Sequence, residues 1–175
     1  MKEHIASVAA SLFYSEGINR VGVDRVAGKA GVTKRTLYHH FPSKDELVAA
    51  ALRSAPIALF PEAGQPLERI RGAFASLHAY LRDTEFRGCP YIIYSAEITD
   101  RQHPARQFIE RRIFKRRKWF EARLQEAGVN DATAVAEELD VLFDGALASG
   151  TKRANLEPVK AAMRAASRVL ESARS

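Results

Sequence analysis

The sequence predicts an all-α protein, with a three-helix helix-turn-helix domain at the N-terminus and a larger helical bundle behind it. Apolar residues recur at intervals of three and four residues along almost the whole chain, which is the period of an amphipathic helix. Glycine, proline and hydroxyl residues stand where these apolar stripes begin and end, as helix termini require. No segment alternates apolar and polar residues in the manner of a half-buried strand.

The first two helices are predicted from short apolar stripes. One stripe runs from Ile5 to Phe13, and Gly17 is expected to end that helix because glycine takes the left-handed conformation past a helix terminus. The second helix covers Val23 to Ala30. It ends at Gly31, which tolerates the positive φ of a tight turn.

The third and fourth helices begin at hydroxyl residues. Thr33 is suited to cap the third helix, and Pro42 ends it. Ser43 and Glu46 have the spacing of a capping box, in which each side chain satisfies a backbone donor of the other residue. They open a fourth helix that is expected to continue to Arg53.

A change of composition between Ser54 and Pro66 indicates a domain boundary, because prolines and a glycine interrupt any helix there. We place the N-terminal domain at residues 1–53 and the second domain at residues 54–175. Further helical stripes are predicted within the second domain. They lie at residues 67–81, 91–98, 103–127, 131–146 and 158–170.

Composition limits the class of protein. The chain has 175 residues, of which 46% are hydrophobic and 27% charged, and its net charge of +6 favours a polyanionic partner. A single cysteine, Cys89, excludes an intrachain disulfide and fits a reducing cytoplasm. No apolar run approaches the roughly 18 residues that a membrane span needs.

The sequence offers no catalytic motif, and we therefore expect no enzyme, no catalytic residue, no cofactor and no metal site. It lacks a glycine-rich phosphate loop, zinc-ligand spacing and a nucleophile motif. His39 and His40 are adjacent on a helix, so their side chains diverge and do not readily share a metal. Cys89 is a candidate redox sensor, although a free cysteine is more often a small buried hydrophobe.

The stretch from Val23 to Lys44 has the length of a helix-turn-helix, whose second helix enters the major groove of DNA. Apolar residues at Val26, Ala27, Val32 and Leu37 would pack its two helices together. The outward residues would then be suited to DNA, since cations bind guanine edges or phosphates and hydroxyls reach bases. The candidate DNA-binding residues are Thr33, Lys34, Arg35, Thr36, Tyr38, His39, His40 and Lys44.

The run from Val26 to Lys44 (VAGKAGVTKRTLYHHFPSK) resembles the DNA-binding signature of the TetR family, and Ala9-x-x-Leu12-Phe13-x-x-x-Gly17 resembles its first helix. The resemblance implies a homodimer on a near-palindromic operator and a second domain that binds a small-molecule effector. It also implies DNA contacts, mostly to phosphates, at Thr33, Lys34, Tyr38, His39 and Lys44. Gly22 departs from the family, which usually has a hydroxyl residue at this cap, so a phosphate contact from that side chain is lost.

The second domain supplies candidates for a dimer interface and for an effector site. In the family the last two helices form a four-helix interface, which implies contacts from Leu139, Leu142, Phe143, Ala146, Ala166, Val169 and Leu170; the alternative is that these residues belong to the monomer core. Gly88 to Glu97 resembles a less specific pattern of TetR regulatory domains. Candidate effector-binding residues are His78, Tyr91, Tyr94, Arg112, Arg116, Trp119 and Phe120.

The long helix carries a basic run from Arg111 to Lys118. Helical geometry places Arg116 among the apolar residues Ile109, Ile113, Phe120 and Leu124, where an unpaired charge is costly. Arg116 or Arg112 would therefore bind an anionic effector, or form a salt bridge to Glu97 or Glu121, or extend its charged end to solvent.

Taken together, these observations predict a ligand-responsive, sequence-specific transcription regulator in the cytoplasm, with repression as the expected direction. A small molecule would favour a conformation in which the two recognition helices are wrongly spaced. The alternative is an architectural DNA-binding protein that has no effector.

Overall fold

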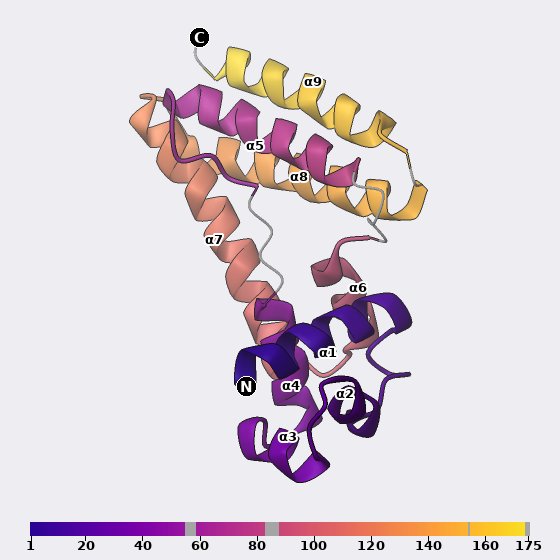
Figure 1. Cartoon of the computed structure of the whole chain (residues 1–175). Coiled ribbons are helices and arrows are strands. Elements are labelled where there is room, and N and C mark those ends of the chain that lie inside the picture. The colour runs from indigo at the N-terminus through magenta and orange to yellow at the C-terminus, as the bar shows by residue number, and fades with distance from the viewer. Residues whose placement is uncertain (55–58, 83–87, 154, 174–175) are drawn as a thin grey trace. The chain divides into compact units, whose positions relative to one another are not determined.

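The computed structural model describes residues 1–54, 59–82, 88–153 and 155–173, and these residues form helices and no strand. The helices are labelled α1 to α9 in chain order (Figure 1). They cover Lys2–Glu16, Val23–Lys29, Lys34–His40, Lys44–Arg53, Pro66–Leu81, Pro90–Glu97, Pro104–Glu126, Ala132–Arg153 and Glu157–Ser172. The predicted all-α class is confirmed. None of the described helices is both long and apolar enough to cross a membrane.

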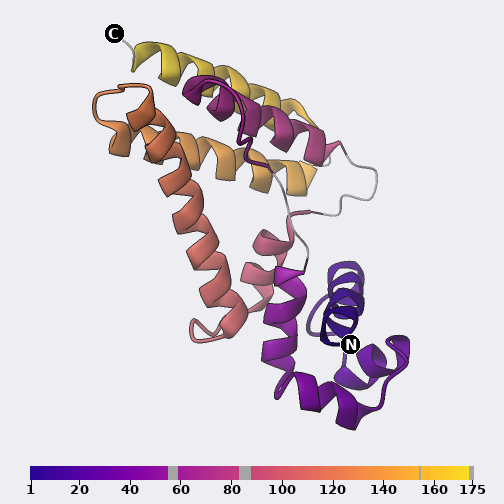
Figure 2. The same ribbon diagram turned by 60° about the vertical axis from the view of Figure 1, so that its left-hand side comes forward.

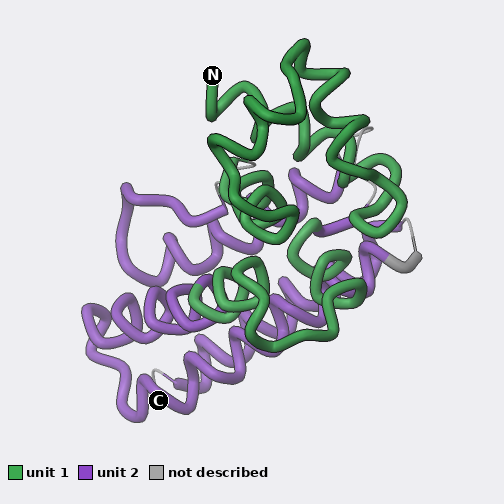
Figure 3. The backbone as a smooth tube through the Cα atoms, turned by 90° about the horizontal axis from the view of Figure 1, so that it is seen from below, with its two compact units in different colours: residues 1–57, 90–111 green, residues 58–89, 112–175 purple. Residues whose placement is uncertain are grey.

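The chain divides into two compact units (Figure 3). Unit 1 consists of residues 1–57 and 90–111, so it combines α1 to α4 with α6 and the beginning of α7. Unit 2 consists of residues 58–89 and 112–175, and contains α5, the rest of α7, α8 and α9. The compact units thus assign residues 90–111 to the N-terminal part of the chain. The functional division at residue 54 stays a prediction.

The ends of the first four helices follow their capping chemistry. Gly17 ends α1 with φ 92°, and its N–H donates to the Phe13 carbonyl. Thr33 caps α3, where its hydroxyl accepts a hydrogen bond from the Thr36 N–H at 3.1 Å. Ser43 caps α4 by accepting from the Glu46 N–H at 3.1 Å. This is one of the two bonds of the predicted capping box.

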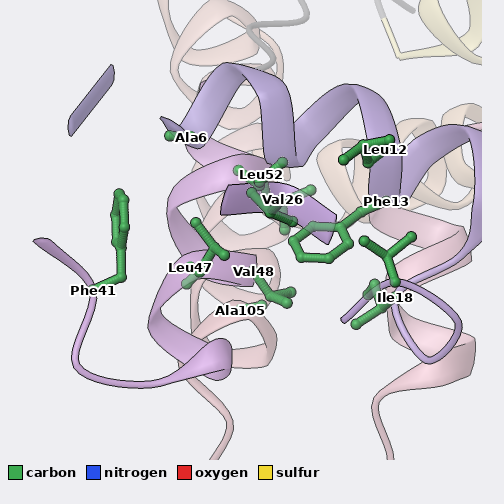
Figure 4. Close-up of a cluster of buried hydrophobic side chains, with 14 of the residues drawn as sticks. Ala6, Leu12, Phe13, Ile18, Val26, Phe41, Leu47, Val48, Leu52 and Ala105 are labelled. Carbon is green, nitrogen blue, oxygen red and sulfur yellow. The ribbon is translucent and has the colours of Figure 1, made fainter. Parts of the chain in front are cut away.

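A continuous apolar core holds unit 1 together (Figure 4). Phe13 of α1, Val26 of α2 and Leu47 of α4 are completely buried in it. Tyr94, Ile98, Ala105 and Ile109 belong to the same cluster, so α6 and the first turns of α7 complete the core of the N-terminal helices. Burying a large apolar side chain contributes about 1.5–3 kcal/mol, and the segment 90–111 therefore stabilises this unit substantially.

In unit 2, the helices α5, α8 and α9 lie side by side (Figures 1 and 2). Gly150 of α8 lies against the Leu81 side chain of α5, where a Cβ atom would be 2.9 Å from Leu81 Cδ1, so a larger residue there would displace this side chain. An aromatic cluster fills the space beside them. Its members are Phe60, Phe74, Trp119, Phe120 and Phe143, with ring centroids 5.1 Å apart for Phe60 and Trp119 and 5.4 Å apart for Phe74 and Phe143.

Two predicted details of unit 2 differ in the structure. Ile113 was expected on the buried face of the long helix, but its side chain is 43% exposed, while Phe120 and Leu124 of the same stripe are buried. Asp131, at the start of the stripe predicted at residues 131–146, lies one residue before α8; its backbone carbonyl accepts from the Val135 N–H, and its φ is 52°. Aspartate tolerates this left-handed conformation better than most residues.

Candidate nucleic-acid interface

The turn between α2 and α3 is held by backbone hydrogen bonds around Gly31. The Val32 N–H donates to the Ala27 carbonyl at 3.0 Å, and the Gly31 N–H donates to the Gly28 carbonyl at 3.2 Å. Gly31 has φ 68°, and a Cβ atom there would meet nothing within 4 Å. The backbone conformation, rather than lack of space, is therefore what favours glycine at this turn.

The inner face of the helix pair is closed by apolar contacts. Val26 and Leu37 are fully buried and Ala27 almost so, as their spacing predicts, while Val32 is half-buried against the same core. Since Leu37 fixes the rotation of α3, the residues on the opposite side of that helix must face outward.

The outward side of α3 presents cations and aromatic hydrogen-bonding groups. Lys34, Arg35, Tyr38 and His39 are exposed, and Tyr38 is 40% exposed despite its large ring. The structure therefore gathers on one helix most of the residues that the sequence predicts to contact DNA. Of the remaining candidates, Thr33 is exposed, and Thr36, His40 and Lys44 are half-buried.

Several of these side chains already have partners. The Thr33 and Thr36 hydroxyls lie 2.9 Å apart and form a hydrogen bond. The Lys34 ammonium lies 3.0 Å from Asp24 Oδ1, and this partner raises the pKa of Lys34 through a hydrogen bond and its charge. The Lys44 ammonium donates to the Ile18 carbonyl at 2.7 Å. Binding a phosphate through either lysine requires it to leave or share its present partner.

His39 and His40 pack edge to face, with ring centroids 5.4 Å apart and planes at 67°. The part of the chain that the structure describes contains no cluster of three histidine, cysteine, aspartate or glutamate residues suited to a metal ion.

The helix-turn-helix is braced by residues that the sequence analysis missed. His4 Nε2 lies 3.3 Å from the Ala30 carbonyl at the turn, and the Lys2 ammonium lies 5.5 Å from the centroid of the Phe41 ring. His103, at the start of α7, is buried and lies 3.4 Å from Asp45 in the first turn of α4. These contacts join residues far apart in the sequence, so no local motif signals them.

Glu97 at the end of α6 is a further bracing residue. It accepts a hydrogen bond from the Asn19 N–H at 3.2 Å, in the loop that joins α1 to α2. The same carboxylate lies against Gly17, where a Cβ atom would be 3.4 Å from Glu97 Oε1. Residues of α6 and α7 thus hold the loops on which the helix-turn-helix is mounted.

The candidate effector residues fall into both units. Tyr91 and Tyr94 belong to unit 1, and burial raises the pKa of Tyr94, with a smaller contribution from Glu97. Trp119 and Phe120 come together in the aromatic cluster of unit 2, where Phe120 is completely buried. His78 and Arg112 of unit 2 are half-buried. Binding of an effector by any of them stays a prediction.

Arg116 is paired within unit 2. Its Nε donates to Asp140 Oδ1 at 2.5 Å and its Nη2 to Asp144 Oδ1 at 3.1 Å, while its side chain is only 11% exposed. Burial alone would lower the pKa of Arg116, but Asp140 and then Asp144 outweigh it and raise that pKa. The predicted partners Glu97 and Glu121 are wrong for this arginine. They instead accept from the Asn19 N–H and the Lys118 ammonium.

Most candidate dimer residues are buried within a single chain. They are Leu139, Phe143, Ala146, Ala166 and Leu170. Their burial favours the alternative that the sequence left open, a role in the monomer core, and the dimer interface stays a prediction. Leu142 and Val169 retain partial exposure, and Val141, which precedes Leu142 on α8, is 66% exposed.

The arrangement in unit 1 defines a helix-turn-helix DNA-binding module: two short helices set at a glycine turn, a closed apolar inner face, and an outward face of cations and hydrogen-bonding groups. Comparison with known proteins extends this conclusion to the family. The model of bacterial regulatory proteins of the tetR family matches residues 5–51.

Similarity to known regulators continues beyond this module. The chain is 33% identical over 149 residues to the HTH-type transcriptional repressor KstR2 of Mycolicibacterium smegmatis, covering 80% of this chain and 70% of that protein. KstR2 of Mycobacterium tuberculosis is 32% identical over 123 residues, which are 65% of this chain and 60% of that protein. A TetR-type regulator (sav143) of Streptomyces avermitilis has the same fold, with a TM-score of 0.87, 29% identity, and coverage of 99% of this chain and 97% of that one.

The chain belongs to the TetR family of bacterial regulatory proteins. It is therefore a DNA-binding transcriptional regulator rather than an enzyme, as the sequence predicts.

Proposed function

We propose that this regulator represses transcription as a homodimer, that it binds a near-palindromic operator through α3, and that a small-molecule effector releases it. The observation that carries the proposal is the exposed row of Lys34, Arg35, Tyr38 and His39 on a helix fixed by buried Leu37. The direction of regulation is inferred from KstR2, which is named a transcriptional repressor.

The length of α3 supports a dimer. This helix has seven residues. At about 1.5 Å per residue it is roughly 10 Å long, and it spans about three base pairs. A single copy would read too little sequence for a selective site, whereas two copies about 34 Å apart would read two half-sites on one face of the duplex.

Within each half-site, we assign base contacts to Arg35 and Thr36 and phosphate contacts to Thr33, Tyr38, His39 and His40. Arginine forms paired hydrogen bonds with guanine, and a threonine methyl packs on the thymine methyl. Lys34 and Lys44 would bind phosphates after exchange of the carboxylate of Asp24 and the carbonyl of Ile18.

For the dimer surface, we propose the exposed Val141 and the partly exposed Leu142 of α8 with the partly exposed Val169 of α9. They lie beside the buried stripes of both helices and keep surface that a second copy would cover. Replacing Val141 by glutamate should give a monomer in analytical ultracentrifugation. A Val141→Glu variant that keeps the mass of a wild-type dimer would show that the interface lies elsewhere.

The decisive experiment selects binding sites from random DNA with the full chain at fixed salt. An inverted repeat with half-site centres about ten base pairs apart, and its loss in Arg35→Ala, is the expected result. Release of that site by a small molecule would then identify an effector. The cytoplasm is the location that we propose for a regulator that binds such an operator. Salt-sensitive binding without sequence preference would instead support the architectural alternative, which the net charge of +6 would explain.

A further inference from the structure

The first cation of the recognition helix is held by a carboxylate of the neighbouring helix. The Lys34 ammonium lies 3.0 Å from Asp24 Oδ1 and donates to Asp24 Oδ2 at 3.1 Å, so both oxygens of the carboxylate contact the same ammonium group. Both side chains are largely exposed, at 54% for Lys34 and 72% for Asp24. The pair therefore lies on the surface that DNA would meet and is not part of the core.

Two oxygens around one ammonium are also what a DNA phosphate offers. A lysine that contacts a phosphate releases a condensed counterion, and this release supplies essentially all sequence-independent affinity. A lysine already neutralised by a carboxylate gains much less from the same phosphate, because the new contact replaces an existing one. The displaced carboxylate would also face the polyanion.

We propose that Asp24 acts as a counter-charge that withholds Lys34 from the phosphates of non-cognate DNA and so limits sequence-independent binding. The inference rests on the DNA-binding role proposed above for α3. Among the described residues, Asp24 is the one carboxylate that forms an ion pair with α3. Arg35, next to Lys34, is exposed, and among the described residues no carboxylate forms an ion pair with it. Its contacts to DNA are therefore not restrained in the same way.

Asp24 has a second role that a test must separate from this one. It lies in the first turn of α2, where an acidic residue is favourable beside unpaired backbone N–H groups, and Gly22 at the cap of that helix supplies no side chain for this purpose. The roles differ in their dependence on Lys34. Helix stabilisation by Asp24 continues without the lysine, whereas the counter-charge effect requires it.

The test measures affinity for a random-sequence duplex at several salt concentrations. Asp24→Asn should bind more tightly than wild type, by about eightfold at 0.1 M salt if Lys34 gains one full phosphate contact. The ratio of the two affinities should fall about 3.5-fold between 50 and 200 mM salt, because the salt slope steepens by about 0.9. Asp24→Glu keeps the charge and should remain near wild type.

Two comparisons isolate the lysine. In the wild-type background, Glu3→Gln changes the net charge equally at an exposed site on α1 and should bring a smaller gain than Asp24→Asn. In the Lys34→Met background, Asp24→Asn should bring no more than this smaller gain. Asp24→Ser is a second removal of the carboxylate in case the asparagine variant does not fold. Circular dichroism confirms folding of each variant.

A gain from Asp24→Asn that persists undiminished in Lys34→Met, that equals the gain from Glu3→Gln, or that is absent would overturn the inference. Each of these results is compatible with DNA binding through α3. A wild-type chain that binds neither random nor selected DNA is a different outcome, because it refutes the proposed function itself.

Discussion

Removing the charge of Asp140 should destabilise unit 2. The variant Asp140→Asn keeps the shape of the side chain but leaves the Arg116 guanidinium, 11% exposed, with only the more exposed Asp144. Breaking a buried ion pair costs about 3–5 kcal/mol. Because both partners keep some contact with solvent and Asp144 still compensates the charge, we expect a loss of about 2 kcal/mol. For a chain of this length that lowers Tm by about 4–8 °C.

The single tryptophan provides the assay. Trp119 lies in the aromatic cluster of unit 2, 5.1 Å from Phe60 and 5.4 Å from Phe120 by ring centroids, so its fluorescence during urea unfolding reports this unit. The double variant Arg116→Met/Asp140→Leu should recover most of the lost stability, because apolar residues of similar volume often replace a buried pair without loss.

The control for this prediction is Lys160→Ala, which removes the exposed Lys160–Glu157 pair of α9 and should leave the urea midpoint unchanged. If Asp140→Asn shifts the midpoint no more than this control, Arg116 is effectively solvated. The argument from its burial would then be wrong.

Three further predictions concern unit 1. Burial raises the pKa of Tyr94 in the folded chain above its unfolded value near 10, so the contribution of Tyr94 to stability is lost as the pH rises above about 10. The stability measured by urea unfolding should fall there by up to about 1.4 kcal/mol more per pH unit in the wild type than in Tyr94→Phe. Gly31→Ala should cost about 1–2 kcal/mol from its φ of 68° alone, and a neutral result would show that the turn relaxes. Thr33→Ala should cost about 1 kcal/mol through the lost cap of α3, with Thr33→Ser close to wild type in the same thermal melts.

The helix-turn-helix was predictable because its determinants are local. Gly17, Gly31, Thr33 and Ser43 each act on backbone groups within a few residues, so their positions alone indicated where α1 to α4 begin and end. The apolar period likewise predicted that Leu37 would be buried. The exposed face of α3 follows from these facts without any knowledge of tertiary contacts.

Pairings between distant residues were not predictable in the same way. Arg116 pairs with Asp140 and Asp144 on α8, whereas the sequence analysis suggested Glu97 or Glu121. An amphipathic stripe also predicts burial without stating what covers it. This is why Leu139 and Leu170 satisfied the pattern of a dimer interface and yet lie in the core of a single chain.

The extent of the N-terminal unit also depends on contacts between distant residues. These contacts bear on how the protein would be regulated. Proline and glycine placed a boundary near residue 54, but Tyr94, Ile98 and Ile109 complete the core of the N-terminal helices. Glu97 holds the loop before α2, and His103 lies against Asp45 at the start of α4, directly after the recognition helix. An effector that shifted residues 90–111 would therefore disturb contacts to the loop before α2 and to the first turn of α4, which gives the proposed release of DNA a physical route within unit 1.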